Sequence, residues 1–190
     1  MTQVRPPNSR KATAPLCRLG GVATALLASL TLQACSPALD WRQVRPEGWQ
    51  LQLDLPCRPA TQTRLLPLAG VPVELTLLAC SVDEHTFALA STDLQDPGRV
   101  GPALRALGQA ARANVQGQVE QELAAQVKGM TPQADALQWR LRGQRPDGRA
   151  VQAQVLVFAH GTRVFQATLI GAVADDRVTK PFFGSVEVLP

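Results

Sequence analysis

Alternating apolar and polar residues are the feature that most constrains the fold of this chain. Over residues 49–55 and again over 71–79, every second residue is apolar. Side chains on a β-strand point alternately to its two faces, so this period of two predicts half-buried strands. Two further strands are expected over 61–67 and 86–91, with short polar turns between neighbouring strands. Connections of turn length join antiparallel strands.

The clearest helical pattern begins after Asp96, a residue type that caps helix N-termini, with Pro97 at the first helical position. Apolar residues then recur at intervals of three and four as far as Val115, and Gly117 is expected to end the helix. Residues 118–127 fit either a strand or a second helical piece.

The C-terminal third of the chain repeats the order of strands followed by a helix. The expected elements are strands over 137–142, 151–159 and 163–170, turns at 146–148 and 160–161, a short helix over 175–183 and a closing edge segment over 186–189. The whole order predicts an α+β fold. We expect an antiparallel sheet with one main helix and a short C-terminal helix packed on it, as an α/β/α sandwich.

The first 34 residues have the composition of an export signal. Residues 1–19 are basic and contain no acidic residue, whereas residues 20–34 are uncharged and mostly apolar. This is the layout of a secretory signal. Fifteen helical residues would span about 22 Å, less than the roughly 30 Å of a bilayer's hydrocarbon core, which argues against a permanent transmembrane helix.

The apolar run ends in Leu32-Gln33-Ala34-Cys35, which resembles the lipobox of bacterial lipoprotein signals. The resemblance implies that the Cys35 sulfur receives a diacylglyceryl group, that cleavage leaves Cys35 as the first residue, and that its new amine is acylated. Cysteine is needed because a thiolate is the nucleophile that forms the thioether. Ser36 at the next position, in place of Asp, favours the outer membrane. The alternative is ordinary cleavage after Ala34, which leaves a free or disulfide-bonded Cys35.

This reading divides the chain into a signal peptide (1–34), a lipidated tether (35–47) and a single globular domain (48–190). Two or three acyl chains such as palmitate would anchor the protein at the periplasmic face of the envelope. The net charge is +4, but four of the 19 basic residues and none of the 15 acidic residues precede Cys35. The mature chain is therefore neutral, and a nucleic-acid partner is not expected.

Cysteine usage points to an oxidising compartment. The four cysteines are Cys17, Cys35, Cys57 and Cys80. The first leaves with the signal peptide and the second carries lipid, so the economical inference is a disulfide between the other two. A metal site is not expected, because the two histidines lie far apart in sequence with no ligand spacing around them. No cofactor is expected.

Stretches spread over nearly the whole mature chain, among them DWRQVRPEG, LPCRP, TFALASTDLQDPGRV and HGTRVFQATLIGA, resemble an uncharacterised family of betaproteobacterial lipoproteins. That family carries the same two cysteines after the lipidated one, and no activity is assigned to it. The element order also resembles the PsbP-like α/β/α sandwich, without a shared motif. A likeness of fold does not license a function, so no binding residue is carried over.

One charge cluster stands out on the predicted hairpin around residues 146–148. It consists of Arg140, Arg142, Arg145 and Arg149, with only Asp147 in opposition. The ordinary interpretation is the solvated side of a sheet. The sharper hypothesis is contact with anionic lipid headgroups or with an anionic envelope protein, which a tethered domain could reach.

Three functions remain open, because the chain contains no catalytic or nucleotide-binding motif. The leading hypothesis is a non-catalytic envelope lipoprotein that binds a protein, lipid or glycan, or helps to assemble a complex. The second is an envelope hydrolase whose site is assembled from Asp93, His85 and His160, although both histidines are expected to be exposed turn residues. The third is a carrier of a small apolar ligand, which needs an apolar cavity between sheet and helix.

Overall fold

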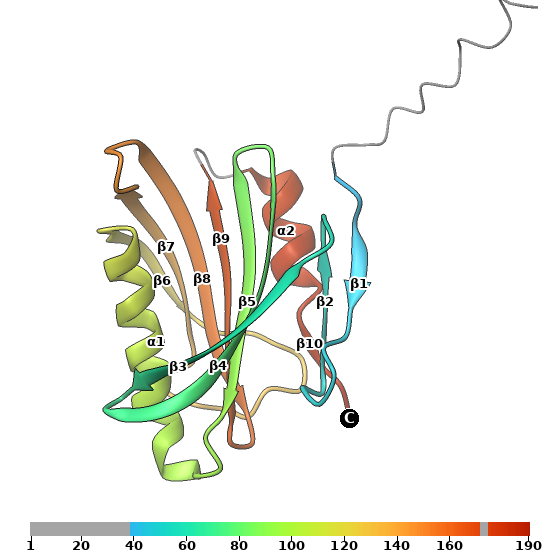
Figure 1. Cartoon of the computed structure of the whole chain (residues 1–190), viewed down its shortest axis with the longest axis vertical. Coiled ribbons are helices and arrows are strands. Elements are labelled where there is room, and N and C mark those ends of the chain that lie inside the picture. The colour runs from blue at the N-terminus through green and yellow to red at the C-terminus, as the bar shows by residue number, and fades with distance from the viewer. Residues whose placement is uncertain (1–38, 172–174) are drawn as a thin grey trace, which may run out of the picture. The chain divides into compact units, whose positions relative to one another are not determined.

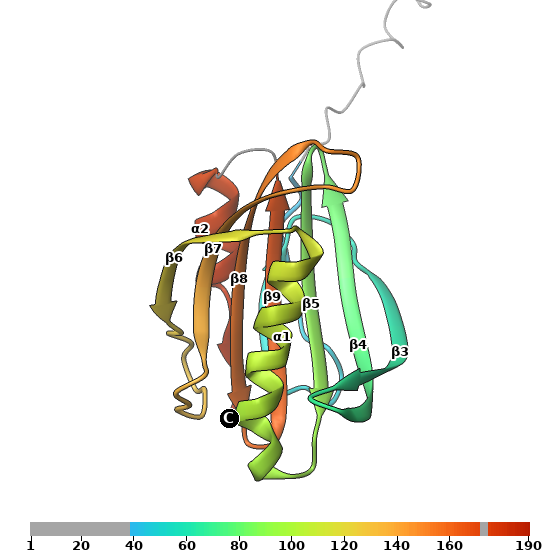
Figure 2. The same cartoon turned by 90° about the vertical axis from the view of Figure 1, so that its left-hand side faces the viewer.

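A curved antiparallel sheet with a helix on each side organises the domain (Figures 1 and 2). The computed structural model describes residues 39–171 and 175–190. The strands are β1 (Arg42–Val44), β2 (Leu51–Leu55), β3 (Ala60–Leu68), β4 (Val71–Val82), β5 (His85–Asp93), β6 (Gln118–Ala124), β7 (Leu137–Gln144), β8 (Ala150–His160), β9 (Arg163–Gly171) and β10 (Glu187–Val188). The helices are α1 (Val100–Asn114) and α2 (Asp176–Gly184), and a 3-10 turn, Pro97–Arg99, precedes α1.

The main sheet has seven strands in the order β3-β4-β5-β9-β8-β7-β6, and every neighbouring pair is antiparallel. Helix α1 packs on one face, chiefly over β8 and β9. Helix α2 lies on the opposite face, as Figure 1 shows. The α+β class, with one main helix and one short C-terminal helix on an antiparallel sheet, is thus confirmed.

A second, three-stranded sheet (β1-β2-β10) lies beside α2 and was not expected from the sequence. Its first strand falls inside the segment 35–47 that was expected to be a tether. The Asp40 backbone N–H donates to the Pro56 carbonyl oxygen at 2.9 Å, and Leu39 and Trp41 pack against the core. The expected boundary at residue 48 is therefore wrong, because the folded domain includes residues from 39 onwards.

Three local expectations are resolved or corrected. Of the ambiguous residues 118–127, the first seven form strand β6. Asp96 does act as a cap, accepting from the Gly98 backbone N–H at 2.8 Å, but it caps the 3-10 turn that leads into α1. The turn between β8 and β9 is made by Gly161 and Thr162, so His160 belongs to the strand and not to the turn.

The apolar core has one layer on each face of the main sheet. Towards α2, the buried Phe182 ring meets the Phe87 ring edge-on, with 5.3 Å between centroids. Towards α1, the half-buried Trp139 ring lies against Gly108, where an added Cβ would come within 2.4 Å of the ring. In the described part of the chain, no helix is long and apolar enough to cross a membrane.

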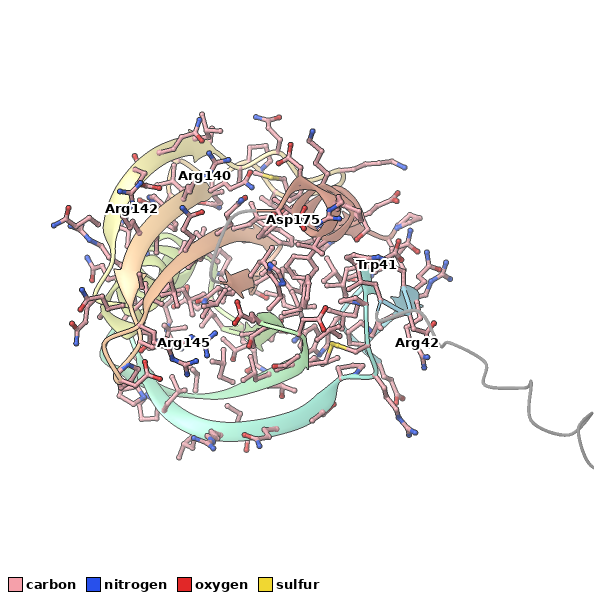
Figure 3. All side chains as sticks on the ribbon, turned by 90° about the horizontal axis from the view of Figure 1, so that it is seen from above. Trp41, Arg42, Arg140, Arg142, Arg145 and Asp175 are labelled. Atoms are coloured by element: carbon pink, nitrogen blue, oxygen red, sulfur yellow. A yellow bond between two sulfur atoms is a disulfide. The ribbon has the colours of Figure 1, made fainter. Side chains whose placement is uncertain are left out.

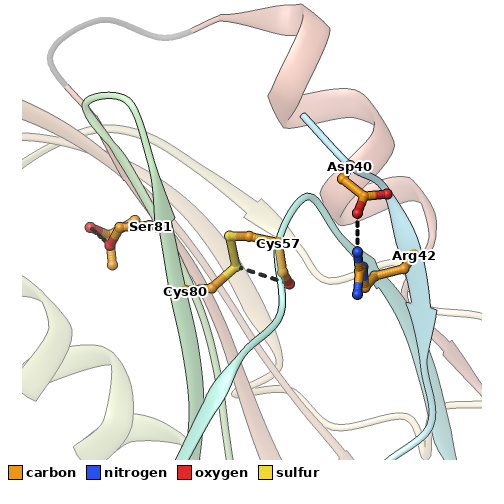
Figure 4. The surroundings of a disulfide bond; sticks show 6 residues. Asp40, Arg42, Cys57, Cys80 and Ser81 are labelled. Carbon is orange, nitrogen blue, oxygen red and sulfur yellow. Dashed lines mark hydrogen bonds and ion pairs between the residues drawn. A yellow bond between two sulfur atoms is a disulfide. The ribbon is translucent and has the colours of Figure 1, made fainter. Parts of the chain in front are cut away.

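The expected disulfide between Cys57 and Cys80 is present (Figure 4). Cys57 follows the end of β2, and Cys80 lies on β4. The bond therefore joins the small sheet covalently to the main sheet, across 23 residues of sequence.

Candidate functional site

A cleft of about 510 Å³ lies where β4 begins and β5 ends, and we call it the polar cleft. Eight of its twelve lining residues carry polar or charged side chains: Glu74, Thr76, Ser91, Thr92, Asp93, Gln95, Arg99 and Arg163. Such a lining suits a polar ligand, because each group exposed in the cleft can exchange its water for a hydrogen bond to the ligand.

Strand alternation brings most of these groups together. Ser91 and Asp93 are two residues apart on β5, so they share one face of the sheet. In the ladder, Thr76 of β4 lies opposite Ser91, and Arg163 of β9 lies opposite Asp93. Three neighbouring strands thus present their polar side chains on the face that carries α2.

Asp93 is the most tightly held group of the polar cleft. Its Oδ1 accepts from the Thr162 hydroxyl at 2.7 Å and from the Gln95 backbone N–H at 3.0 Å, and its Oδ2 lies 3.8 Å from Nη2 of Arg163. The Thr162 hydrogen bond, then the Gln95 backbone hydrogen bond, lower the pKa of Asp93 despite partial burial, and the Arg163 charge adds to the effect. Asp93 is therefore a fixed negative charge at neutral pH.

Other groups of the polar cleft are available to a ligand. Glu74 and Arg99 line it, and neither takes part in an ion pair within residues 39–171 and 175–190. Arg163 Nη1 donates to the buried Ser91 hydroxyl at 3.4 Å. Trp49 packs on Phe165, with 6.2 Å between ring centroids, and also borders the cleft. The cleft thus offers a carboxylate, a guanidinium and hydroxyl groups together.

Neither histidine lines the polar cleft that contains Asp93. His85 begins β5 and Asp93 ends it, which separates them by about 26 Å along the strand. His160 ends β8, and its Nδ1 donates to the Gly129 carbonyl at 3.0 Å. Both rings are half-buried in strands, so the expectation of exposed turn residues is wrong. In the ladder, Arg163 lies opposite both His160 and Asp93 and so stands between them, whereas His85 is too far from Asp93 for a direct proton transfer.

The four arginines of the predicted hairpin fall into two places (Figure 3). Arg140 and Arg142 share one face of β7, whereas Arg145 and Arg149 flank the β7–β8 turn and line a smaller pocket of about 260 Å³ with Asp83 and Glu84. The grouping inferred from sequence therefore does not form one surface.

Several groups besides Asp147 interact with these arginines, whereas the sequence led us to expect Asp147 as their only acidic neighbour. Arg142 pairs with Glu120 at 2.6 Å, and Arg149 pairs with Asp147 at 2.7 Å. Nη2 of Arg145 lies 3.5 Å from the Glu84 carbonyl oxygen. Glu120 could not be placed from the sequence, because it lies at a register shift in β6.

Of the polar cleft, sequence reasoning identified only Asp93. The available signal was the alternation of side chains along β5. Phe87, Leu89, Ser91 and Asp93 lie on the same face of the strand, so two polar residues follow two buried apolar ones on that face. Cys35, the predicted lipidation site, lies outside the described residues. Within those residues, no three His, Cys, Asp or Glu side chains gather in a group that could hold a metal ion.

No family model and no curated protein sequence matches the chain. Among solved structures, the crystal structure of PA94, a protein of unknown function from Pseudomonas aeruginosa, matches at 17% sequence identity. The match covers 74% of this chain and 89% of that one, with a TM-score of 0.40.

Proposed function

We propose that this protein is a lipid-anchored envelope protein with a binding or assembly role, and that the polar cleft is where it binds. The single observation that carries the binding role is the cleft itself, a hollow of about 510 Å³. It is lined by buried hydroxyl groups and by a carboxylate (Glu74) and a guanidinium (Arg99) that form no ion pair with any residue the structure describes. The ligand would be a polar envelope component that offers both hydrogen-bond donors and acceptors.

Two features support export and anchoring. Cys35 directly follows the one long apolar run of the chain, in a sequence that resembles a lipobox. The Cys57–Cys80 disulfide fits an oxidising compartment such as the periplasm, because cytoplasmic thiols are kept reduced. With Ser36 after the cysteine, we place the anchor in the outer membrane.

The distance of His85 from Asp93, and the hydrogen bond of His160 to the Gly129 carbonyl, support a binding role over hydrolysis. A hydrolase of the kind considered would need a base within hydrogen-bond reach of its nucleophile or water. Asp93 is committed to Thr162, Gln95 and Arg163, and its lowered pKa makes it a poor proton donor at neutral pH. The polar lining of the cleft likewise fits a small apolar ligand poorly.

Site-specific photo-crosslinking in living Gram-negative cells tests the binding role. A photoreactive amino acid at position 74, on the cleft, is compared with one at position 62, on the exposed edge strand β3. We expect a discrete adduct from position 74 only, which is lost when Arg99→Glu is added. Identical patterns from both positions, or an adduct indifferent to Arg99→Glu, would exclude the cleft as the binding site.

A further inference from the structure

The folded domain begins only a few residues after Cys35, so the proposed tether between the lipid and the domain is short. The Asp40 backbone N–H is already bonded to Pro56, and Arg42 opens a strand. Only five residue steps separate Cys35 from Asp40, and they span at most about 18 Å when fully extended. A lipidated Cys35 would therefore hold Asp40 close to the bilayer surface.

Asp40 lies at one end of the domain, which we call the anchor end. The Cys57–Cys80 disulfide ties the end of β2, where Leu55 pairs with Arg42, to the end of β4, and in the main sheet Thr86 pairs with Ile170 near the end of β9. Besides Asp40, the anchor end comprises the β4–β5 turn at Asp83 and Glu84, the β7–β8 turn at 145–149, and the start of α2 at Asp175. Figure 3 looks down onto it, with Trp41, Arg42, Arg145 and Asp175 labelled.

Three Asp-x-Arg pairs lie at the anchor end, beside the carboxylates of Asp83 and Glu84 and the guanidinium of Arg145. Asp40 pairs with Arg42, Asp147 with Arg149 at 2.7 Å, and Asp175 with Arg177 at 2.8 Å. In the last two pairs, the hydrogen bond from the arginine side chain lowers the pKa of the aspartate, so both partners stay charged. Paired opposite charges of this kind match the phosphate and ammonium groups of zwitterionic lipid headgroups and are not repelled by them.

The polar cleft lies at the other end of the same strands. Strand β5 runs from His85 at the anchor end to Asp93 in the cleft, a rise of about 26 Å. We propose that the anchor end faces the zwitterionic phospholipid headgroups of the membrane that holds the acyl chains, so that the polar cleft opens away from the bilayer. The proposal rests on the proposed lipid anchor and assigns a membrane-facing surface to the folded domain.

Energy transfer to a labelled bilayer tests the orientation in the full lipidated protein. A fluorescent amino acid replaces Pro146 in the β7–β8 turn or, as the matched control, Ala134 in the exposed loop just before β7 at the opposite end. The vesicles contain phosphatidylethanolamine and phosphatidylcholine with an acceptor dye on their headgroups. Because the two ends are about 26 Å apart, transfer from position 146 should exceed that from position 134 at least about twofold.

Flotation of the vesicles separates the possible failures. Protein that does not float overturns the anchor, and the orientation with it. Protein that floats but shows equal transfer from both positions, or more from position 134, overturns the orientation alone. Inserting about a dozen Gly and Ser residues between Ser36 and Pro37 should shrink the difference, because a flexible linker frees the domain. A difference unchanged by the insertion would overturn the short tether as its cause.

Discussion

At the scale of single residues, Gly143 has the tightest surroundings among the glycines of the described residues. A Cβ at this position would lie 2.0 Å from the Val115 carbonyl oxygen and 3.2 Å from the Gly117 Cα. Val115 follows the end of α1, and its carbonyl also accepts from the Gln144 backbone N–H at 2.8 Å. Gly143 thus lets the end of the main helix dock on β7.

We expect Gly143→Ala to lower the free energy of unfolding by about 1–3 kcal/mol or more, because backbone atoms of both segments would have to separate. Urea unfolding followed by circular dichroism measures the change. The matched control is Gly184→Ala, where an added Cβ meets nothing within 4 Å and the change should stay within about 0.5 kcal/mol. Equal stability of the two variants would refute the close approach.

Asp93 should link stability to pH. Its pKa is lower in the folded protein than in the unfolded chain, so ionised Asp93 stabilises the fold above the unfolded value of about 3.9. The contribution is lost as the pH falls through the lower folded-state pKa. We therefore expect Asp93→Asn to be less stable than wild type at pH 7 and the gap to close towards pH 3.

Urea unfolding midpoints of wild type and Asp93→Asn at pH 7, 5 and 3 check this prediction. The acidic residues that both proteins share contribute equally, so the difference between the midpoints isolates Asp93. Thr162→Val removes the hydrogen bond that lowers the pKa most and should weaken the pH dependence in the same way. A gap that stays constant with pH would contradict the assignment.

At the scale of elements, the Cys57–Cys80 disulfide cross-links the two sheets in addition to the backbone. In the chain-entropy account, closing a loop over 23 residues of sequence contributes about 3 kcal/mol to stability. We expect the Cys57→Ser/Cys80→Ser double variant to lose about this amount in urea unfolding. Amide exchange should also quicken in β1 and β2 relative to β8 and β9, because the small sheet loses its link to β4.

Uniform exchange across the two sheets of the double variant would show that the disulfide does not hold the small sheet in particular. Wild type treated with a reductant serves as the second form of the same test. It should behave like the double variant if the serine side chains themselves have no effect.

The elements that could be predicted from sequence are those whose own residues carry a repeating pattern. Alternation located β2, β4 and β5, and helical spacing located α1, because each buries one face along its length. Strand β1 has three residues, too few to show any period, so it was missed and the tether was drawn too long. Strand β10 lies within the expected closing edge segment over 186–189, but its pairing with β2 in a separate small sheet was not expected.

The polar cleft escaped prediction for a different reason. Its groups come from four separate stretches of the chain, and only strand pairing brings Thr76, Ser91 and Arg163 to one place. Register between distant strands is a tertiary property that no local pattern encodes. The disulfide was predictable because counting cysteines and assigning a compartment left a single pair.

At the scale of the whole molecule, the domain has two distinct ends. Three Asp-x-Arg pairs lie at the anchor end, together with Asp83, Glu84 and Arg145, and the polar cleft lies at the other end. This polarity suits a domain held close to a membrane by a short tether that binds a polar partner on its far side. The whole account depends on the proposed covalent anchor at Cys35.

The most direct measurement is therefore intact mass combined with membrane flotation of wild type and Cys35→Ala made in a Gram-negative bacterium. We predict that wild type floats with membranes, begins at Cys35 and carries the added mass of a diacylglyceryl group and an N-linked acyl chain. Cys35→Ala should lack this mass and lose processing at this position. A soluble wild type that is cleaved after Ala34 and bears no lipid would contradict the account.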